Sequence, residues 1–371
     1  MKPLAGIRVV ELARILAGPW CGQLLADLGA EVVKVERPGA GDDTRHWGPP
    51  FLHDAGGNNR DAAYYHAANR GKTARFIDIA TPEGQAEVHA LIADADVVIE
   101  NYKVGGLVKY GLDPASIRAL YPRAIVCSIT GFGQAGPYAH RAGYDFIIQG
   151  MGGIMSLTGE PDGAPQKAGI AYADIFTGVY SAVAILAALR QRDTTGVGAH
   201  IDMALLDTQV AVLANQALNW MASGKVPHRM GNGHANLAPY QAFTASDGDL
   251  IIAVGNDGQF RKLCNVLGLS LADDPDFATN PARVRNRARL IAPIQAAIAD
   301  WTKQQLSEAL EAQGVPAGPI NNVDEVFADP QVLARGMAIV AGGLPGVASP
   351  IVIDGERMVS DLPSPARPPD A

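Results

Sequence analysis

Alternating strand and helix patterns constrain the fold of this chain more than any other sequence feature. Residues 7–12 and 31–36 have strand patterns, and between them a helix begins at Pro19 and ends at Gly29. Further strand patterns follow at 76–79, 96–100 and 124–129. Because strand–helix–strand units build parallel sheets, we expect an α/β fold with a Rossmann-like open parallel sheet and helices on both faces.

The length of 371 residues predicts two domains rather than one hydrophobic core. After residue 222 the helix patterns give way to loops, a strand pattern at 250–254 and further short helix patterns. We expect a large Rossmann-like domain at 1–222, completed by a returning segment at 323–371, and a small α+β domain at 223–322. The proline-rich end, 362–371, is expected to be extended.

Composition and charge exclude several classes of protein. The net charge of −8, with 18% charged residues, argues against nucleic acid or an anionic membrane as a main partner. The N-terminus lacks the apolar core of a signal peptide, and no apolar run reaches membrane length without polar residues. The three cysteines and eight histidines show no metal-ligand spacing, so we expect no metal and a cytoplasmic protein with buried thiols.

Several catalytic and phosphate-binding motifs are missing. Residues 13–19, after the first strand pattern, contain no G-x-G-x-x-G, which disfavours a dinucleotide-dependent dehydrogenase. Gly71-Lys72-Thr73 resembles the end of a P-loop, but His66 stands where the first glycine of that motif belongs. No G-x-S-x-G indicates a serine hydrolase.

A single carboxylate, Asp174, precedes the uncharged apolar run 175–189, which is typical of a buried helix. We expect the positive end of that helix to stabilise the ionised form of Asp174. An ionised carboxylate in a partly dry site can attack an activated acyl group. The alternative, that Asp174 is only the N-cap of the helix, is favoured by this stretch taken alone.

Ligands of open α/β sheets bind beyond the carboxyl ends of the strands, where Arg37, Asn101 and Phe132 are expected. Six basic residues in nearby loops are candidates for binding phosphates, or are solvated surface charges: Arg37, Arg45, Arg70, Lys72, Lys103 and Lys109. His234 lies in the glycine-containing loop 231–236 and is either a substrate contact or a surface histidine.

At several separate segments the chain resembles the class III coenzyme A transferases of the CaiB/BaiF type, a family that also includes the α-methylacyl-CoA racemases. The matching segments are 4–12, 16–19, 29–39, 98–102, 128–133 and 167–180. Three more, 41–50, 239–243 and 314–322, are most similar to the succinyl-CoA:glutarate (dicarboxylate) branch. The resemblance covers nearly the whole chain.

The resemblance implies two protomers threaded as interlocked rings and Asp174 as the catalytic nucleophile. Asp174 would form an anhydride with the acyl group of an acyl-CoA and then a thioester with CoA, which the acceptor acid takes up. It implies CoA contacts at Leu16, Ala17, Arg37, Ile77, Asp78, Ile79, Ala80, Asn101, Tyr102, Lys103, Lys109, Thr130, Gly131, Phe132 and Gly133. The large domain would therefore bind acyl-CoA, which is a substrate rather than a bound cofactor.

Two departures from the family pattern bear on these expectations. The run of glycines that covers the site in formyl-CoA transferases is absent, which disfavours formate or oxalate chemistry. The usual family segment beyond the proline-rich end is also absent from this sequence, which leaves contacts between protomers open.

Two alternative functions remain at this stage. Racemases carry a His-Asp pair where this chain has Tyr144-Asp145, and tyrosine is a poor base at neutral pH. A non-catalytic CoA-binding protein would keep the basic loops without needing Asp174.

We expect a dicarboxylate acceptor and succinyl-CoA as donor. The second carboxylate of such an acid needs a cation or N–H donors inside the site. Arg45 and His234 are the candidates for binding it, with Tyr144 as a further candidate substrate contact; Arg45 could instead pair with Asp42 or Asp43.

Overall fold

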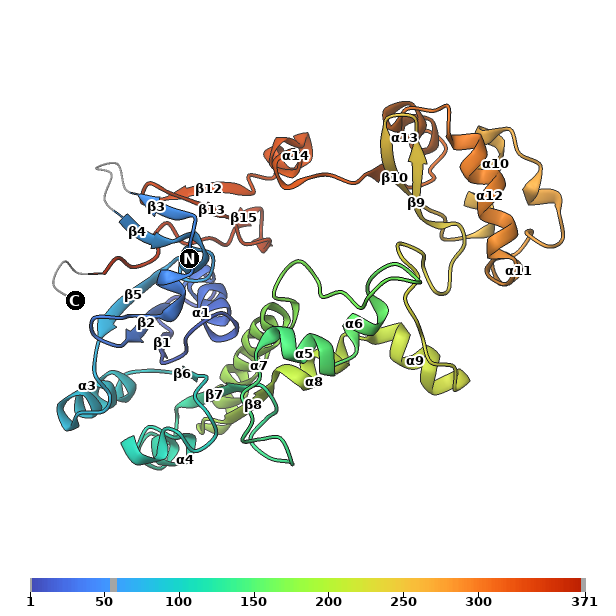
Figure 1. Ribbon diagram of the computed structural model, residues 1–371. Helices are drawn as coiled ribbons and strands as arrows, with labels where there is room; N and C mark the ends of the chain where they lie inside the picture. Colours follow the sequence, from blue (N-terminus) through green and yellow to red (C-terminus); the bar gives the residue numbers. More distant parts are fainter. Residues whose placement is uncertain (1, 54–58, 368–371) are drawn as a thin grey trace. The chain divides into compact units, whose positions relative to one another are not determined.

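The computed structural model describes residues 2–53 and 59–367. Contacts divide the chain into two compact units, shown in Figure 1. The first unit comprises 1–154, 167–214 and 329–371, and the second comprises 155–166 and 215–328. The domain bounds expected from the sequence, 1–222 with 323–371 and 223–322, stay a prediction.

The first unit is built on a six-stranded parallel sheet with the order β5-β2-β1-β6-β7-β8. Its strands are β1 (Arg8–Glu11), β2 (Glu31–Glu36), β5 (Lys72–Phe76), β6 (Val97–Glu100), β7 (Ile125–Thr130) and β8 (His200–Ala204). In this doubly wound order the chain adds strands on one side of β1 as far as β5 and then on the other side from β6 onward. Sheets of this kind bind ligands at the carboxyl ends of the two strands where the order changes, here β1 and β6. The expected α/β class with a parallel sheet is confirmed.

One strand is displaced from its expected position. The pattern at 76–79 predicted a strand, whereas β5 ends at Phe76. The carbonyl of Asp78 accepts hydrogen bonds from the backbone and hydroxyl of Thr81, so the chain turns there. Thr81 then caps α3 (Pro82–Ala93), accepting from the Gly84 N–H at 3.1 Å.

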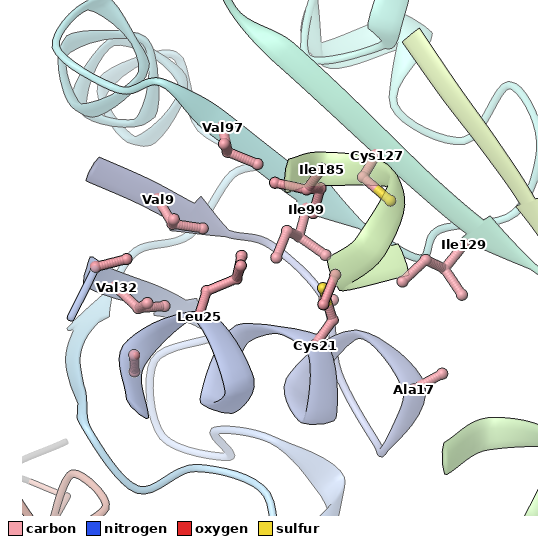
Figure 2. Close-up of a cluster of buried hydrophobic side chains, with 14 of the residues drawn as sticks. Val9, Ala17, Cys21, Leu25, Val32, Val97, Ile99, Cys127, Ile129 and Ile185 are labelled. Atoms are coloured by element: carbon pink, nitrogen blue, oxygen red, sulfur yellow. The ribbon is translucent and has the colours of Figure 1, made fainter. Parts of the chain in front are cut away.

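Helices cover both faces of this sheet because successive strand residues point to opposite sides. Val9 lies in a core with α1 (Ala17–Asp27) and α7 (Tyr172–Thr195), to which Leu25 and Ile185 contribute (Figure 2). Val10, the next residue, lies in the core formed with α3 and α4 (Pro114–Leu120). Figure 2 also shows Cys21 and Cys127 inside the first core, and all three cysteines are buried and free.

Helix α7 keeps an apolar face that the chain itself does not cover. Val179, Tyr180, Val183 and Leu186 are exposed on it, as are Phe146, Ile147 and Met151 of the neighbouring α5 (Asp145–Met151). Within the described residues, α7 is the one helix long and apolar enough to span a membrane by length and composition, a test that core helices of soluble proteins also pass. Patches of this kind mark interaction sites.

The second unit is an α+β unit with a three-stranded antiparallel sheet of order β11-β10-β9. Its main elements are β9 (Tyr240–Ala245), β10 (Gly248–Ala253), β11 (Ala317–Pro319), α10 (Asp257–Leu267), α11 (Asn280–Arg285), α12 (Arg287–Ile298) and α13 (Lys303–Glu311). A separate core joins Phe243 and Leu250 of the sheet to Leu263, Leu290 and Leu306 of the helices. Residues 205–223 form two helices rather than one, α8 (Leu205–Ala211) and α9 (Ala214–Ser223), because Ala214 has φ +46°.

The returning C-terminal segment binds to the first unit. Gly71 N–H donates to the Leu362 carbonyl at 2.9 Å, and Ser360 N–H donates to the Asp27 carboxylate at 2.8 Å. Its elements are α15 (Pro330–Ala334), β12 (Ala338–Ala341), β13 (Leu344–Val347), β14 (Val352–Ile353) and β15 (Glu356–Arg357), preceded by α14 (Val323–Ala328). The expected extended end lies partly outside the described residues, since 368–371 are not described.

The remaining short elements lie in the connections. They are η1 (Asp43–His46), β3 (Phe51–His53), β4 (Asn59–Ala62), α2 (Ala63–His66), η2 (Val108–Tyr110) and α6 (Ile154–Leu157). Among them, the helical turn η1 contains the buried residues Thr44 and Arg45, and Arg45 matters for the site described next.

Candidate functional site

A pocket of about 460 Å³ lies in the first unit at the carboxyl ends of β1 and β6, where the strand order reverses. It continues over the ends of β7 and β8 to the N-terminus of α7. Ten residues expected to bind CoA or substrate line it: Leu16, Ala17, Asn101, Tyr102, Lys103, Lys109, Thr130, Gly131, Tyr144 and Asp174. This is the position at which open α/β sheets bind ligands.

Seven of the expected CoA contacts do not line this pocket: Arg37, Ile77, Asp78, Ile79, Ala80, Phe132 and Gly133. Arg37 directly follows β2, and 77–80 follow β5, at the same edge of the sheet. Phe132 instead stacks edge-on against Tyr138, with ring centroids 5.7 Å apart. The N–H of Gly133 is occupied by the Thr130 hydroxyl at 2.9 Å.

Other lining residues were not singled out from the sequence. They are Arg14, Ile15, Val104, Gly106, Tyr110, Ile129, Ala139, Arg141, Ala142, Gly143 and Leu205. Arg14 and Arg141 are exposed and add positive charge to the rim formed by Lys103 and Lys109. The position of Arg14 just after the first strand pattern could have identified it as a pocket residue. For Arg141 the sequence offers no such indication beyond the glycines near it.

Asp174 is the third residue of α7 and does not cap it. The N-cap position is Ala171, which has no side chain to accept a hydrogen bond. The carboxylate of Asp145 does so instead, accepting from the N–H of Ala173 at 2.8 Å and of Asp174 at 3.3 Å. The alternative that Asp174 is only an N-cap is therefore wrong, and its half-buried carboxylate faces the pocket without a hydrogen-bond donor from the described residues.

The pKa of Asp174 is raised to about 7, first by burial and then by the nearby charge of Asp145. This direction is opposite to the expected stabilisation by the helix end. The physical reason is that burial disfavours the charged carboxylate. In addition, Asp145 accepts the N–H groups of Ala173 and Asp174, and its negative charge opposes a second negative charge beside it. Asp145 is itself held by the side-chain amide of Gln149 at 2.7 Å. Asp174 thus changes its charge near neutral pH.

Tyr64, in α2, lies close enough to Asp174 for the carboxylate to affect the ionisation of its hydroxyl. Burial, followed by the charges of Asp174 and Asp145, raises the pKa of Tyr64 to about 12, so its hydroxyl stays protonated at neutral pH. Trp47 contacts the Tyr64 ring edge-on, with centroids 5.2 Å apart. The sequence interpretation missed Tyr64, because only the fold brings α2 near the N-terminus of α7.

A buried cluster of charges lies behind the pocket wall. Lys34 Nζ is 2.9 Å from Glu11 and 3.0 Å from Asp42, and all three side chains are fully buried. Lys72 Nζ is 2.8 Å from Glu11. Burial alone lowers a lysine pKa, but Glu11 and Asp42 outweigh it and raise the pKa of Lys34. The pKa of Lys72 is lowered by burial to about 8, and this buried lysine is no phosphate-binding residue.

Arg45 also belongs to a buried structural network and not to a substrate site. Its guanidinium is 2.7 Å from Glu36 and 2.6 Å from Asp61, and it lies 3.8 Å from the centre of the Tyr65 ring. It is 1% exposed, so the expectation that it binds substrate is wrong. A structural pair was the alternative, but its partners are not Asp42 or Asp43: those carboxylates bind Lys34 and, at 2.8 Å, Arg14.

Arg70, another candidate for phosphate, is also occupied. Its guanidinium pairs with Asp27 at 2.6 Å and donates to the Val347 carbonyl, which ties the returning C-terminal segment to α1. Of the six basic candidates, Lys103 and Lys109 line the pocket, and Arg37 is exposed beyond β2.

His234 and Tyr144 have different surroundings. Tyr144 is 62% exposed, lines the pocket and immediately precedes Asp145. His234 belongs to the second unit, where its Nδ1 accepts from the N–H groups of Asn236 at 3.0 Å and Leu237 at 3.1 Å. The neutral ring therefore carries its proton on Nε2. In the described part of the chain, no group of three or more His, Cys, Asp or Glu is placed to hold a metal ion.

Comparisons with known proteins show the family of the chain. The family model described as CoA-transferase family III matches residues 4–367. Succinate–glutarate CoA-transferase of Agrobacterium fabrum is 57% identical over 369 residues, covering 98% of this chain and 92% of that protein. Human succinyl-CoA:glutarate CoA-transferase is 43% identical over 340 residues, covering 91% of this chain and 76% of its own length.

The fold is likewise shared with a solved structure. The crystal structure of a CAIB/BAIF family protein from Brucella suis has a TM-score of 0.87 at 60% sequence identity, covering 98% of this chain and 96% of that one. The matched family extends over both compact units. The chain is therefore an enzyme that belongs to CoA-transferase family III.

Proposed function

We propose that this enzyme moves CoA from succinyl-CoA to a dicarboxylic acid, with Asp174 as the covalent nucleophile. The observation that carries the proposal is the Asp174 carboxylate, which faces the pocket at the reversal point of the sheet with no hydrogen-bond donor from the described residues. The substrates come from similar proteins named as succinate–glutarate and succinyl-CoA:glutarate CoA-transferases.

In the proposed reaction, an oxygen of Asp174 attacks the thioester carbonyl, the C–S bond breaks, and CoA leaves as a thiolate. The thiolate then attacks the Asp174 carbonyl of the anhydride, which releases succinate and leaves an aspartyl-CoA thioester. The acceptor carboxylate attacks that thioester and again displaces the thiolate. Attack of the thiolate on the acceptor's acyl carbonyl finally forms the new acyl-CoA and restores Asp174.

The charge of the pocket rim supports CoA as the ligand. Lys103, Lys109 and Arg141 line the pocket together with Arg14, which pairs with Asp43, and guanidinium and ammonium groups bind phosphates. We propose that the far end of CoA extends over β2 and β5 to Arg37 and residues 77–80. Arg37 follows β2, the strand next to β1, and residues 77–80 follow β5, one strand further along the same edge. Adjacent strands lie about 4.8 Å apart.

Substitution of Asp174 tests the nucleophile. Asp174→Asn has nearly the same shape, so the protein should fold, but CoA transfer should fall by roughly three or more orders of magnitude. In the wild type, hydroxylamine added with succinyl-CoA should convert Asp174 to its hydroxamate, detected by peptide mass spectrometry. Near-normal transfer by Asp174→Asn would disprove the mechanism.

The raised pKa of Asp174 predicts how the rate depends on pH. Only the carboxylate attacks, and below about pH 7 the raised pKa keeps it protonated, so kcat/KM should rise with pH and level off above that value. Asp145→Asn removes the second cause of the shift while keeping an oxygen that accepts from α7, so the rising limb should move to lower pH. The same profile in both proteins would contradict this explanation.

The proposed dicarboxylate specificity predicts strong discrimination between acids of equal length. A site that binds a second carboxylate should give glutarate a kcat/KM at least about 100-fold above that of pentanoate, because the apolar end leaves the site's polar groups unpaired. New thioesters would be measured by mass spectrometry with succinyl-CoA as donor. Equal values for the two acids would show that no second-carboxylate site exists.

We propose further that the protein is a homodimer, interlocked as the family resemblance implies. The exposed apolar residues of α5 and α7 support a second copy as their cover, since such a face is unfavourable in water. Light scattering should give twice the chain mass of 38.9 kDa. Val183→Glu on that face should weaken the dimer, whereas Ala90→Glu, at an exposed position of α3 on the other face of the sheet, should not. A monomeric wild type would refute the proposal.

A further inference from the structure

The wall of the pocket includes a backbone turn that its own sequence does not favour. Arg14, Ile15 and Leu16 line the pocket between β1 and α1. Ile15 has φ +73°, in the left-handed region that β-branched residues rarely adopt. Such a residue keeps this conformation only when its surroundings hold it.

Three side chains from separate elements form hydrogen bonds with the backbone of three consecutive residues of this turn, Ala13, Arg14 and Ile15. Lys34 of β2 donates to the Ala13 carbonyl at 2.8 Å. Asn101, directly after β6, accepts from the Arg14 N–H at 2.9 Å and donates to the Arg14 carbonyl at 2.7 Å. Asp42 accepts from the Ile15 N–H at 3.2 Å. The N–H of the strained residue Ile15 is thus held by Asp42, and the backbone of the preceding residue, Arg14, is held by Asn101.

Two of these three anchors are themselves immobilised. Lys34 and Asp42 form a fully buried ion pair, and Asp42 also accepts from the N–H and hydroxyl of Thr44. Asn101 is half-buried and outside the ion cluster, so it can be changed without leaving a buried charge unpaired. Both ends of its amide are occupied by Arg14, which leaves the amide little capacity to bind a ligand directly.

We infer that Asn101 is a positioning residue, which acts on the acyl-CoA ligand by holding Ile15 in the left-handed conformation that shapes the pocket wall. The inference rests on the proposed CoA-transfer function and assigns Asn101 a role different from the direct contact implied by the family resemblance. Without the two hydrogen bonds to Arg14, residue 15 relaxes toward ordinary backbone angles, and the wall loses the shape that receives the ligand.

The direct test is the affinity of the full-length protein for CoA, measured by isothermal titration calorimetry, together with KM for succinyl-CoA. Losing two hydrogen bonds of ordinary net strength in Asn101→Ala should raise both constants by roughly tenfold. The circular dichroism spectrum should remain that of the wild type. If Asn101→Ala does not fold, Asn101→Asp keeps the acceptor for the Arg14 N–H, loses the donor to the Arg14 carbonyl, and should show a smaller increase.

A second substitution at residue 15 distinguishes positioning from a merely structural role. Ile15→Gly and Ile15→Ala both remove the side chain from the pocket wall, but only glycine adopts φ +73° without strain. In the Asn101→Ala background, the glycine variant should therefore bind CoA several-fold more tightly than the alanine variant, while with Asn101 intact the two should bind alike. This difference between backgrounds is the signature of the proposed role.

The outcomes separate this inference from the proposed function. If the wild type binds CoA and Asn101→Ala binds it equally well, the inference is wrong while CoA transfer stands. Equal affinities of the two double variants would also overturn it, because the loss in Asn101→Ala would then not pass through the conformation of residue 15. If the wild type does not bind CoA, the proposed function fails and the inference fails with it.

Discussion

The buried ion pairs of Lys34 with Glu11 and Asp42 are the interaction on which the site depends. Glu11 ends β1, Lys34 belongs to β2, and Asp42 begins the turn that carries η1. Buried ion pairs add little net stability over apolar packing, because removing both charges from water is costly. Their contribution here is geometric: buried charges have few alternative partners, so Glu11 and Lys34 on the strands fix the position of Asp42 and of the turn that begins there.

That arrangement reaches the pocket through the backbone of the first strand–helix connection. A charged cluster on one side and Asn101 on the other hold consecutive carbonyl and N–H groups of residues 13–15. The same polar layer continues through Glu36 and Arg45 to Asp61, which also binds Arg367 of the returning segment at 2.7 Å. The C-terminal segment is thereby bonded to the layer that supports the pocket.

Two neighbouring carboxylates at the N-terminus of α7 differ in their hydrogen bonding. Asp145 accepts the helix N–H groups, and Asp174 is left half-buried beside it without that stabilisation. A carboxylate stabilised by helix N–H groups would be a weaker nucleophile, because its charge would already be neutralised by hydrogen bonds. The raised pKa of Asp174 thus results first from burial and then from the charge of Asp145, and the hydroxyl of Tyr64 nearby remains a protonated donor.

The sequence by itself determined the layered α/β fold, because buried parallel strands are short apolar runs and their helices have recognisable caps. It also placed Asp174 before an apolar helix and Asn101 at a strand end, since in a parallel sheet the carboxyl ends of the strands must meet at one edge, whereas Arg37 and Phe132, expected at the same edge, do not line the pocket. Local patterns carry this information without reference to distant residues.

Only the tertiary structure decided which charged residues line the pocket. Arg45 and Arg14 both lie in loops near strand ends, yet Arg45 is buried among Glu36, Asp61 and Tyr65, whereas Arg14 lines the pocket. The ion-pair partners of these two arginines are 9 to 29 positions away in sequence. The pKa of Asp174 likewise depends on a distant residue, Asp145, in addition to burial. A guanidinium or carboxylate has the same sequence signature whether it is paired or free, because its electrostatic environment exists only after the chain has folded.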